Sequence, residues 1–342
     1  TARLSAKAEG LGIEDRGLRK EGAWNEKKAQ QKASIHNPQS STRPRVLLVH
    51  PGIQHAPRLA EALEREGMLA GFWTGWAKAR GSPSQLGKRR VGIPTEKLKT
   101  LPWLEWMALL FSRTGIDPEK VWHWRNRIFQ NLIPDKEIAE ADVVIGFDTG
   151  SWILAQKAKE MGKKFILDQS IGHPAARIPE MQKMGRAEET WSEPYQPRPG
   201  KLVDWEKMEH ELADRIVVGS QFTQNTLIGQ GVPTEKIGIL PYGVGEEFVA
   251  AGERRARDVV GKVRFLFLGQ LAQRKGVQLL LEAWKGLPSG RAELVLMGGG
   301  PRRGWRRVAG EGVIFRGQAA RKKVLEEMGR SDVLVLPSLF EG

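Results

Sequence analysis

From Arg45 onward, short runs of Val, Ile and Leu alternate with longer stretches of helical periodicity. This rhythm is typical of buried parallel strands that are joined by crossover helices, and it predicts an α/β fold. With 342 residues the chain is too long for one ordinary core, and it suits two Rossmann-sized domains with an additional segment.

The alternation occurs in two series. The first series predicts strands at residues 46–50, 69–74, 143–147, 164–168, 216–219 and 236–240. A Pro and two glycines at residues 241–245 then permit a turn between two rigid bodies. The second series predicts strands at 263–269, 293–297, 313–315 and 333–336, with helices at 277–287 and 322–329. We therefore expect a first domain at 44–245 and a second at 246–342. The polar segment 1–43 is predicted to be a disordered tail.

Composition narrows the classes of function. The chain has 54 Lys or Arg against 40 Asp or Glu, a net charge of +14, which favours partners that carry phosphates. Cysteine is absent, which excludes disulfides and Cys nucleophiles and agrees with a reducing, cytoplasmic location. No apolar run reaches the roughly 18 residues of a membrane span, so we expect a soluble or peripheral protein.

Doubly wound sheets bind ligands beyond the carboxyl ends of their strands. The first such loop reads His50-Pro51-Gly52-Ile53-Gln54-His55 and leads into a predicted helix at 56–66. Gly52 would let backbone N–H groups approach a phosphate at a helix N-terminus. A single glycine after a strand is, however, often only a tight turn.

The loop after the first strand of the second series carries a stronger signal. It reads Gly269-Gln270-Leu271-Ala272-Gln273-Arg274-Lys275-Gly276, with two cations at the start of the next helix. Cations there oppose the helix dipole and so favour an anionic partner. Arg can bind a phosphate through two hydrogen bonds and Lys acts as a point charge, which together suit a diphosphate. The alternative is an exposed basic helix start.

This loop resembles the Gly-Arg-Leu-x-x-x-Lys-Gly stretch of glycosyltransferase family 4, the "group 1" glycosyltransferases of GT-B fold. Four further motifs occur in the same order as in that family: residues 209–220, residues 236–244, Gly298-Gly299-Gly300-Pro301, and Leu336-Pro337-Ser338-Leu339-Phe340-Glu341-Gly342. The resemblance implies two Rossmann-like domains that face a cleft, the second of which binds the donor.

In the family, the Arg and Lys of the first motif hold the donor diphosphate. Lys275 matches that Lys, but Gln270 stands where the family has Arg. We hypothesise that the adjacent Arg274 compensates. The resulting donor-binding candidates are Gly52, Gly269, Gln270, Arg274, Lys275, Gly299, Ser338 and Gly342.

Two residues are candidates for the catalytic centre. Glu341 matches the first glutamate of the family's Glu-x7-Glu motif, which in relatives contacts the transferred sugar. The chain stops before the second glutamate, so we expect a fragment with an incomplete second domain that is itself inactive. His173 follows a predicted strand where relatives often place a histidine near the reacting sugar, although a structural hydrogen bond would explain it equally well. His50 and His55 rank lower.

The segment 148–151, Asp-Thr-Gly-Ser, precedes a predicted helix. Asp and Ser are ordinary helix caps, and we favour that interpretation over a role in lining the acceptor side.

Together these features predict a retaining glycosyltransferase that moves a sugar from a UDP-, GDP- or ADP-sugar to a hydroxyl of a glycan, a lipid-linked acceptor or a small molecule. No Asp-x-Asp pair is present to hold a divalent ion, which agrees with metal-independent transfer and no cofactor. Epimerases and phosphorylases of the same fold are competitors. A non-catalytic sugar-nucleotide-binding relative is an alternative because of Gln270. A nucleic-acid-binding protein is supported only by the net charge, and we expect no nucleic-acid partner.

Residues 101–111, Leu-Pro-Trp-Leu-Glu-Trp-Met-Ala-Leu-Leu-Phe, follow a basic stretch. They could rest on an anionic membrane surface, which would make the protein peripheral at the inner face of the membrane. We favour the alternative, a helix buried in the first domain.

Overall fold

A computed structural model describes residues 43–341 except 53, 80–89, 177–199, 254–260, 288–289, 301–304 and 307–308. The predicted tail lies outside the described residues apart from Arg43. Within the described part, no helix is both long and apolar enough to cross a membrane.

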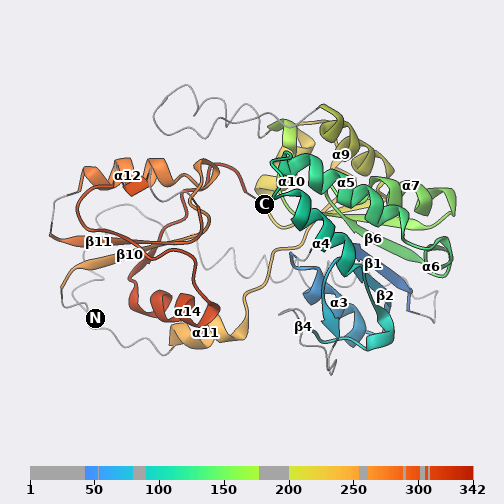
Figure 1. Cartoon of the computed structure of the whole chain (residues 1–342), viewed down its shortest axis with the longest axis horizontal. Helices are drawn as coiled ribbons and strands as arrows, with labels where there is room; N and C mark the ends of the chain where they lie inside the picture. Colours follow the sequence, from blue (N-terminus) through green and yellow to red (C-terminus); the bar gives the residue numbers. More distant parts are fainter. Residues whose placement is uncertain are drawn as a thin grey trace, which may run out of the picture. The chain divides into compact units, whose positions relative to one another are not determined.

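The first part of the chain forms a seven-stranded parallel sheet (Figure 1). Its strand order is β5-β2-β1-β6-β7-β8-β9. In chain order the strands are β1 (Val46–His50), β2 (Leu69–Thr74), β5 (Leu98–Thr100), β6 (Val143–Phe147), β7 (Lys164–Gln169), β8 (Arg215–Val218) and β9 (Ile237–Ile239). The helices are α3 (Ala56–Arg65), α4 (Pro102–Phe111), α5 (Pro118–Asn131), α6 (Asp135–Ala139), α7 (Trp152–Glu160), α9 (Gly200–Leu212) and α10 (Gln221–Ile228).

The first four residues of strand β1 are apolar because both faces of the sheet are covered. Leu47 and Val49 pack in a core with residues of α5, α6 and α7, whereas Val46 and Leu48 pack in a second core with α3. Successive side chains of a strand point to opposite faces, so one continuous apolar run supplies both cores.

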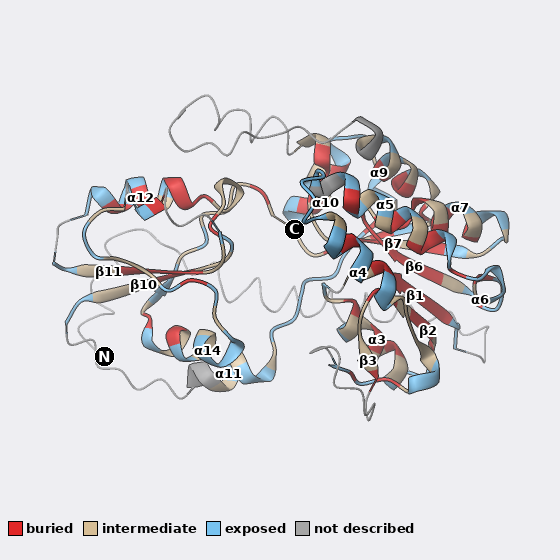
Figure 2. Ribbon diagram, viewed as in Figure 1, coloured by how far each residue is buried: buried red, intermediate tan, exposed pale blue. Residues whose placement is uncertain are grey.

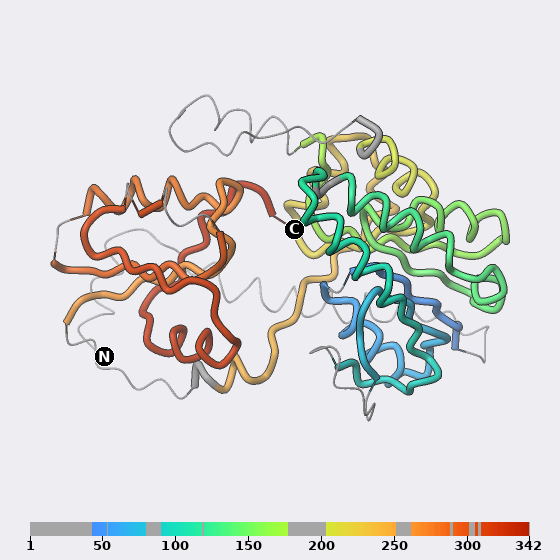
Figure 3. The backbone as a smooth tube through the Cα atoms, viewed as in Figure 1, coloured from blue at the N-terminus to red at the C-terminus, as the bar shows by residue number. Residues whose placement is uncertain are grey.

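The second part forms a four-stranded parallel sheet with the order β12-β11-β10-β13, drawn from orange to red in Figure 3. The strands are β10 (Val263–Leu268), β11 (Ala292–Met297), β12 (Val313–Phe315) and β13 (Val333–Leu334), and the helices are α11 (Glu246–Glu253), α12 (Val277–Lys285) and α14 (Arg321–Arg330). Phe267 packs in a core with α12, and the adjacent Leu266 packs in one with α14.

All ten strands expected from the sequence are present, with boundaries that differ by at most two residues. The sequence missed the short elements that connect them: the edge strand β5, the two-stranded pair β3 (Lys78–Ala79) and β4 (Arg90–Val91), and the one-turn 3₁₀ helices η2 (Thr95–Lys97), η3 (Thr234–Lys236) and η4 (Gln273–Lys275). Two or three residues are too few to show a hydrophobic period.

The favoured interpretation of residues 101–111 as a buried helix was wrong. They form α4, but only Leu104 and Ala108 of this helix are buried, and Figure 2 shows how much of its surface is exposed. The helix is apolar nearly all round, whereas only one narrow side of it packs on the rest of the domain.

Candidate functional site

The structure brings together two cations that the sequence assigned to the donor site and the carboxylate of Glu341, which it assigned to the catalytic centre. Arg274 and Lys275 lie in η4, immediately after β10, and Glu341 follows β13. Nη1 of Arg274 lies 2.9 Å from Oε2 of Glu341, and Nζ of Lys275 forms an ion pair with Oε1 of the same carboxylate. Strands β10 and β13 are neighbours in the sheet, which places the loops at their carboxyl ends side by side.

The backbones of these two loops are also in contact. The amide of Leu339 donates a hydrogen bond of 2.9 Å to the carbonyl of Arg274. Gly276 has φ +68°, and a Cβ at this position would lie 1.9 Å from the carbonyl oxygen of Pro337. Any larger residue would therefore push the loops apart.

A third loop, after β11, completes this edge of the sheet. The amide of Leu271 donates to the carbonyl of Gly299 at 2.7 Å. A Cβ on Gly298 would lie 1.7 Å from the carbonyl oxygen of Gly269. The glycine-rich sequences after β10 and β11 thus let the two loops pack backbone against backbone.

The ion pairs set the charge state of Glu341. Burial by itself would raise the pKa of this carboxyl, but the hydrogen bond from Lys275 and the charge of Arg274 outweigh it and hold the pKa below its usual range. Glu341 is consequently ionised at neutral pH and offsets part of the charge of the two cations. Gln270 is exposed, Ser338 is half-buried, and Gly342 lies outside the described residues.

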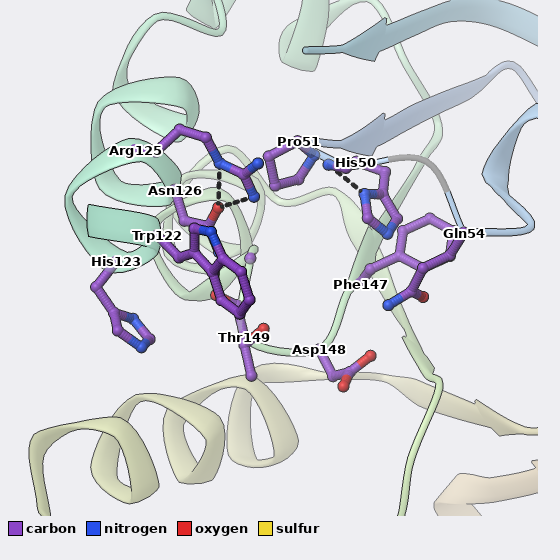
Figure 4. Close-up of a pocket in the computed structure, with 12 residues that line it drawn as sticks. His50, Pro51, Gln54, Trp122, His123, Arg125, Asn126, Phe147, Asp148 and Thr149 are labelled. Atoms are coloured by element: carbon purple, nitrogen blue, oxygen red, sulfur yellow. Dashed lines mark hydrogen bonds between the residues drawn. The ribbon is translucent and has the colours of Figure 1, made fainter. Parts of the chain in front are cut away.

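A second candidate site lies at the carboxyl ends of β1 and β6 in the first sheet (Figure 4). This pocket has a volume of about 380 Å³. It is lined by the loops after both strands and by one side of α5: His50, Pro51, Gly52, Gln54, Trp122, His123, Arg125, Asn126, Phe147, Asp148, Thr149 and Gly150.

His50 is the most deeply buried polar side chain in this pocket's first loop. Its Nδ1 accepts the N–H of Gly52 at 2.7 Å, so the Gly52 amide that we expected to approach a phosphate donates to His50 instead. Burial lowers the pKa of His50 to about 3, which makes the ring neutral. With Nδ1 as an acceptor, Nε2 carries the proton, and Nε2 has no hydrogen-bond partner among the described residues. Burial of this kind cannot be read from one loop histidine in the sequence, and a functional role of His50 stays a prediction.

The helix-cap interpretation of residues 148–151 was wrong. The hydroxyl of Ser151 donates to the carbonyl of Phe147 and makes no cap hydrogen bond to α7. Asp148 accepts hydrogen bonds from the amide and the hydroxyl of Ser170, at 3.0 and 2.7 Å. Asp148 instead lines the pocket of Figure 4, and its role on the acceptor side stays a prediction.

Two residues that are remote in sequence accept hydrogen bonds from the backbone amides at the start of α7. The carboxylate of Glu209 accepts the N–H of Thr149 at 2.9 Å and that of Ser151 at 2.7 Å. The side-chain oxygen of Gln130 accepts the N–H of Ile153 at 2.8 Å. Burial raises the pKa of Glu209 well above its usual value. Neither residue was predicted from the sequence, and only the position of Glu209 inside a family motif could have indicated one of them.

His173 lies apart from the pocket of Figure 4. It lines a separate hollow of about 280 Å³ with Lys207 and His210. Its Nδ1 accepts the N–H of Ala175 at 3.1 Å, and its ring centroid is 5.2 Å from that of His210. Burial lowers the pKa of His173 to about 4. These contacts account for the residue as a structural histidine, while its catalytic role stays a prediction.

Among the residues that the structure describes, no group of three or more His, Cys, Asp or Glu side chains is arranged to hold a metal ion.

Comparison with solved structures defines the class of fold. The chain is similar to sucrose-phosphate synthase from Thermosynechococcus elongatus, with a TM-score of 0.51 and 17% identity over 87% of this chain and 76% of that one. It is similar to the lipopolysaccharide outer core galactosyltransferase WaaB at a TM-score of 0.51 and 14% identity, over 86% and 74% of the two chains. The predicted GT-B class of fold, with two Rossmann-like sheets, is confirmed.

The sequence comparison is more specific for the second part. Residues 262–342 match the family model described as glycosyl transferases group 1, which confirms the resemblance drawn from the motifs. A comparison with curated proteins finds no match to the chain.

Proposed function

We propose that this chain binds a nucleotide diphosphate sugar and transfers the sugar, with retention of configuration and without a metal ion, to an acceptor hydroxyl. The observation that carries the proposal is the convergence of Arg274 and Lys275 on Glu341 within the segment that matches glycosyl transferases group 1. Two cations in contact with an internal carboxylate suit a site that exchanges one anion for another.

In this proposal the donor diphosphate takes the place of the Glu341 carboxylate beside the two cations. Glu341 then contacts the sugar, as the family resemblance implies. The bond between the anomeric carbon and the phosphate oxygen breaks, the acceptor oxygen bonds to the same carbon, and the acceptor proton passes to the departing phosphate. Arg274 and Lys275 stabilise the negative charge that develops on that phosphate.

The acceptor is proposed to bind in the pocket of Figure 4. Sugar rings pack on aromatic faces and present hydroxyls at their edges. Trp122 supplies such a face, the buried Nε2 of His50 can donate to a hydroxyl, and the Asp148 carboxylate can accept from one. No cofactor has a role in this scheme.

A thermal-shift panel of UDP-, GDP- and ADP-sugars tests the donor site. We expect one nucleotide class to raise the melting temperature, in EDTA as well as in buffer alone, and the double variant Arg274→Ala/Lys275→Ala to lose that rise. Lys322→Ala, which removes an exposed cation of α14, is the matched control. If no sugar nucleotide stabilises the wild type, the proposal fails.

A second candidate function is sugar-nucleotide binding without transfer, which Gln270 favours because it brings no charge where the family has Arg. Release of nucleoside diphosphate from the stabilising donor, with and without acceptor sugars, separates the two candidates. Binding without any release would assign the chain to the second.

A further inference from the structure

Helix α4 presents a stripe of large apolar side chains to solvent. Trp103, Trp106, Met107 and Leu110 recur at helical spacing along one side, with exposed fractions of 50%, 52%, 36% and 58%. The ring of Trp106 also packs at 5.3 Å from that of Trp76. Such a row is unusual on a surface helix, where the side away from the core is normally polar.

The apolar surface continues onto the neighbouring helix. Helices α4 and α5 contact each other, and Phe111 at the end of α4 packs edge-on against Trp124 of α5 at 5.3 Å. Trp124 is 36% exposed, and Ile116 in the connection is 45% exposed. We call these side chains, together with the stripe on α4, the α4–α5 surface.

Cations flank this surface. Arg113 in the connection and Lys120 and Arg127 on α5 are exposed, and none of the three forms an ion pair with another described residue. The Glu105 carboxylate, by contrast, is paired with Arg125 at 3.1 Å. Across residues 88–131 the sequence has nine Lys or Arg against four Asp or Glu. The surface is therefore apolar at its centre and basic at its margin.

We propose that the α4–α5 surface docks on an anionic lipid bilayer, with Trp103, Trp106 and Leu110 entering the boundary between head groups and acyl chains. Tryptophan is enriched at that boundary because its ring is apolar and its N–H is polar. Anionic head groups attract nearby Lys and Arg side chains, which explains the basic margin. A protein partner would account for the apolar centre but would not by itself require the cations.

Docking in this way would determine which kind of acceptor reaches the pocket. This consequence rests on the proposed function. Trp122 lies on α5, is 56% exposed, and lines the pocket of Figure 4. Because the pocket and the α4–α5 surface share this helix, a docked protein would receive an acceptor sugar that is carried on a membrane lipid.

Sedimentation with vesicles tests the docking. We expect the wild-type protein to bind vesicles made of equal amounts of phosphatidylcholine and phosphatidylglycerol. The variant Trp103→Ser/Trp106→Ser/Leu110→Ser should bind them about tenfold more weakly, since three apolar side chains no longer leave water. All three residues are exposed, so the variant should fold. The matched control is Val249→Ser/Leu279→Ser/Leu287→Ser, which changes side chains that are 54%, 38% and 47% exposed on the second sheet's domain.

A second set of variants tests the contribution of the basic margin of the α4–α5 surface. Arg113→Glu/Lys120→Glu/Arg127→Glu should abolish the preference for vesicles that contain phosphatidylglycerol over pure phosphatidylcholine. Lys262→Glu/Lys322→Glu/Lys323→Glu, at exposed positions elsewhere, should retain most of it.

Absence of vesicle binding by the wild type would overturn the proposal, as would equal binding to the two vesicle types. Size-exclusion chromatography tests whether the surface instead binds a second copy of the chain. A wild-type dimer that the triple Ser variant converts to a monomer would assign the surface to that second copy. The vesicles contain no donor or acceptor, so failure of docking and failure of sugar transfer are distinguishable.

Discussion

Glu341 is the only described carboxylate that forms ion pairs with Arg274 and Lys275. Glu341 lies 67 and 66 positions beyond Arg274 and Lys275 along the chain, and the three residues meet because β10 and β13 are adjacent. The Glu341 carboxylate holds both cations at the same edge of the sheet, where the proposed function places the donor diphosphate. This makes the pair of cations the first place to test.

Lys275→Ala should weaken binding of the nucleoside diphosphate by about 1.5 to 3 kcal/mol, the usual range for a hydrogen bond to a charged group. Calorimetry measures the dissociation constant directly. Lys322→Ala serves as the control for loss of one positive charge. Unchanged affinity in the Lys275 variant would remove this residue from the donor site.

Because His210 is buried, we expect the free energy of unfolding to depend on pH. Its Nε2 lies 2.8 Å from Oε1 of Gln169, and burial lowers its pKa from 6.5 to about 3. A lowered histidine pKa means that the unfolded chain binds the proton more readily than the folded one. The stabilisation is therefore complete above pH 6.5 and is lost progressively as the pH falls towards 3.

Between pH 6.5 and 4.5 we expect His210 to contribute a loss of about 2 to 3 kcal/mol to the free energy of unfolding. His210→Gln should remove this component, because glutamine does not titrate. Urea unfolding of both proteins at a series of pH values measures the difference. Parallel pH profiles for the two proteins would contradict the prediction.

At the scale of elements, the start of α7 depends on side chains from elsewhere in the domain. Glu209 of α9 accepts two amides of the loop that carries Asp148 into the pocket. The carboxylate thus positions one wall of the proposed acceptor site without touching the acceptor.

Glu209→Ala should lower the free energy of unfolding by about 1 to 3 kcal/mol, since two buried amides lose their acceptor. It should also weaken acceptor binding, because the loop loses its support. Glu211→Ala, an exposed glutamate on the same helix, is the control for loss of one carboxylate. Equal stabilities of the two variants in urea unfolding would show that the loop is held by other contacts.

Across the whole described molecule, two parallel sheets with separate cores are joined by a segment that has no regular structure. Residues 240–245 follow the last backbone hydrogen bond of the first sheet, from Leu240 to Val218 at 2.8 Å. Leu240 and Val244 are 64% and 72% exposed. A protease needs an extended, accessible backbone, and this segment provides one.

Limited digestion with a protease of broad specificity should therefore cut within residues 240–245 before it cuts any strand of either sheet. Mass spectrometry of the early products locates the cut. Earlier cleavage in β10 or β11 would show that the second sheet opens more readily than the connecting segment does.

The sequence by itself determined the α/β class, the position of nearly every strand and the loop that holds the two candidate donor cations. These follow from local patterns, because a strand that is buried on both faces must be apolar throughout and a tight loop between backbones needs glycine. Packing alone decided that Glu341 pairs with Arg274 and Lys275, that His50 is buried in a pocket, that Glu209 supports the loop at α7, and that α4 is exposed. The first three features depend on contacts between residues that are remote in sequence, and the exposure of α4 depends on which of its sides packs against another element. A pattern of neighbouring residues carries no information about such contacts.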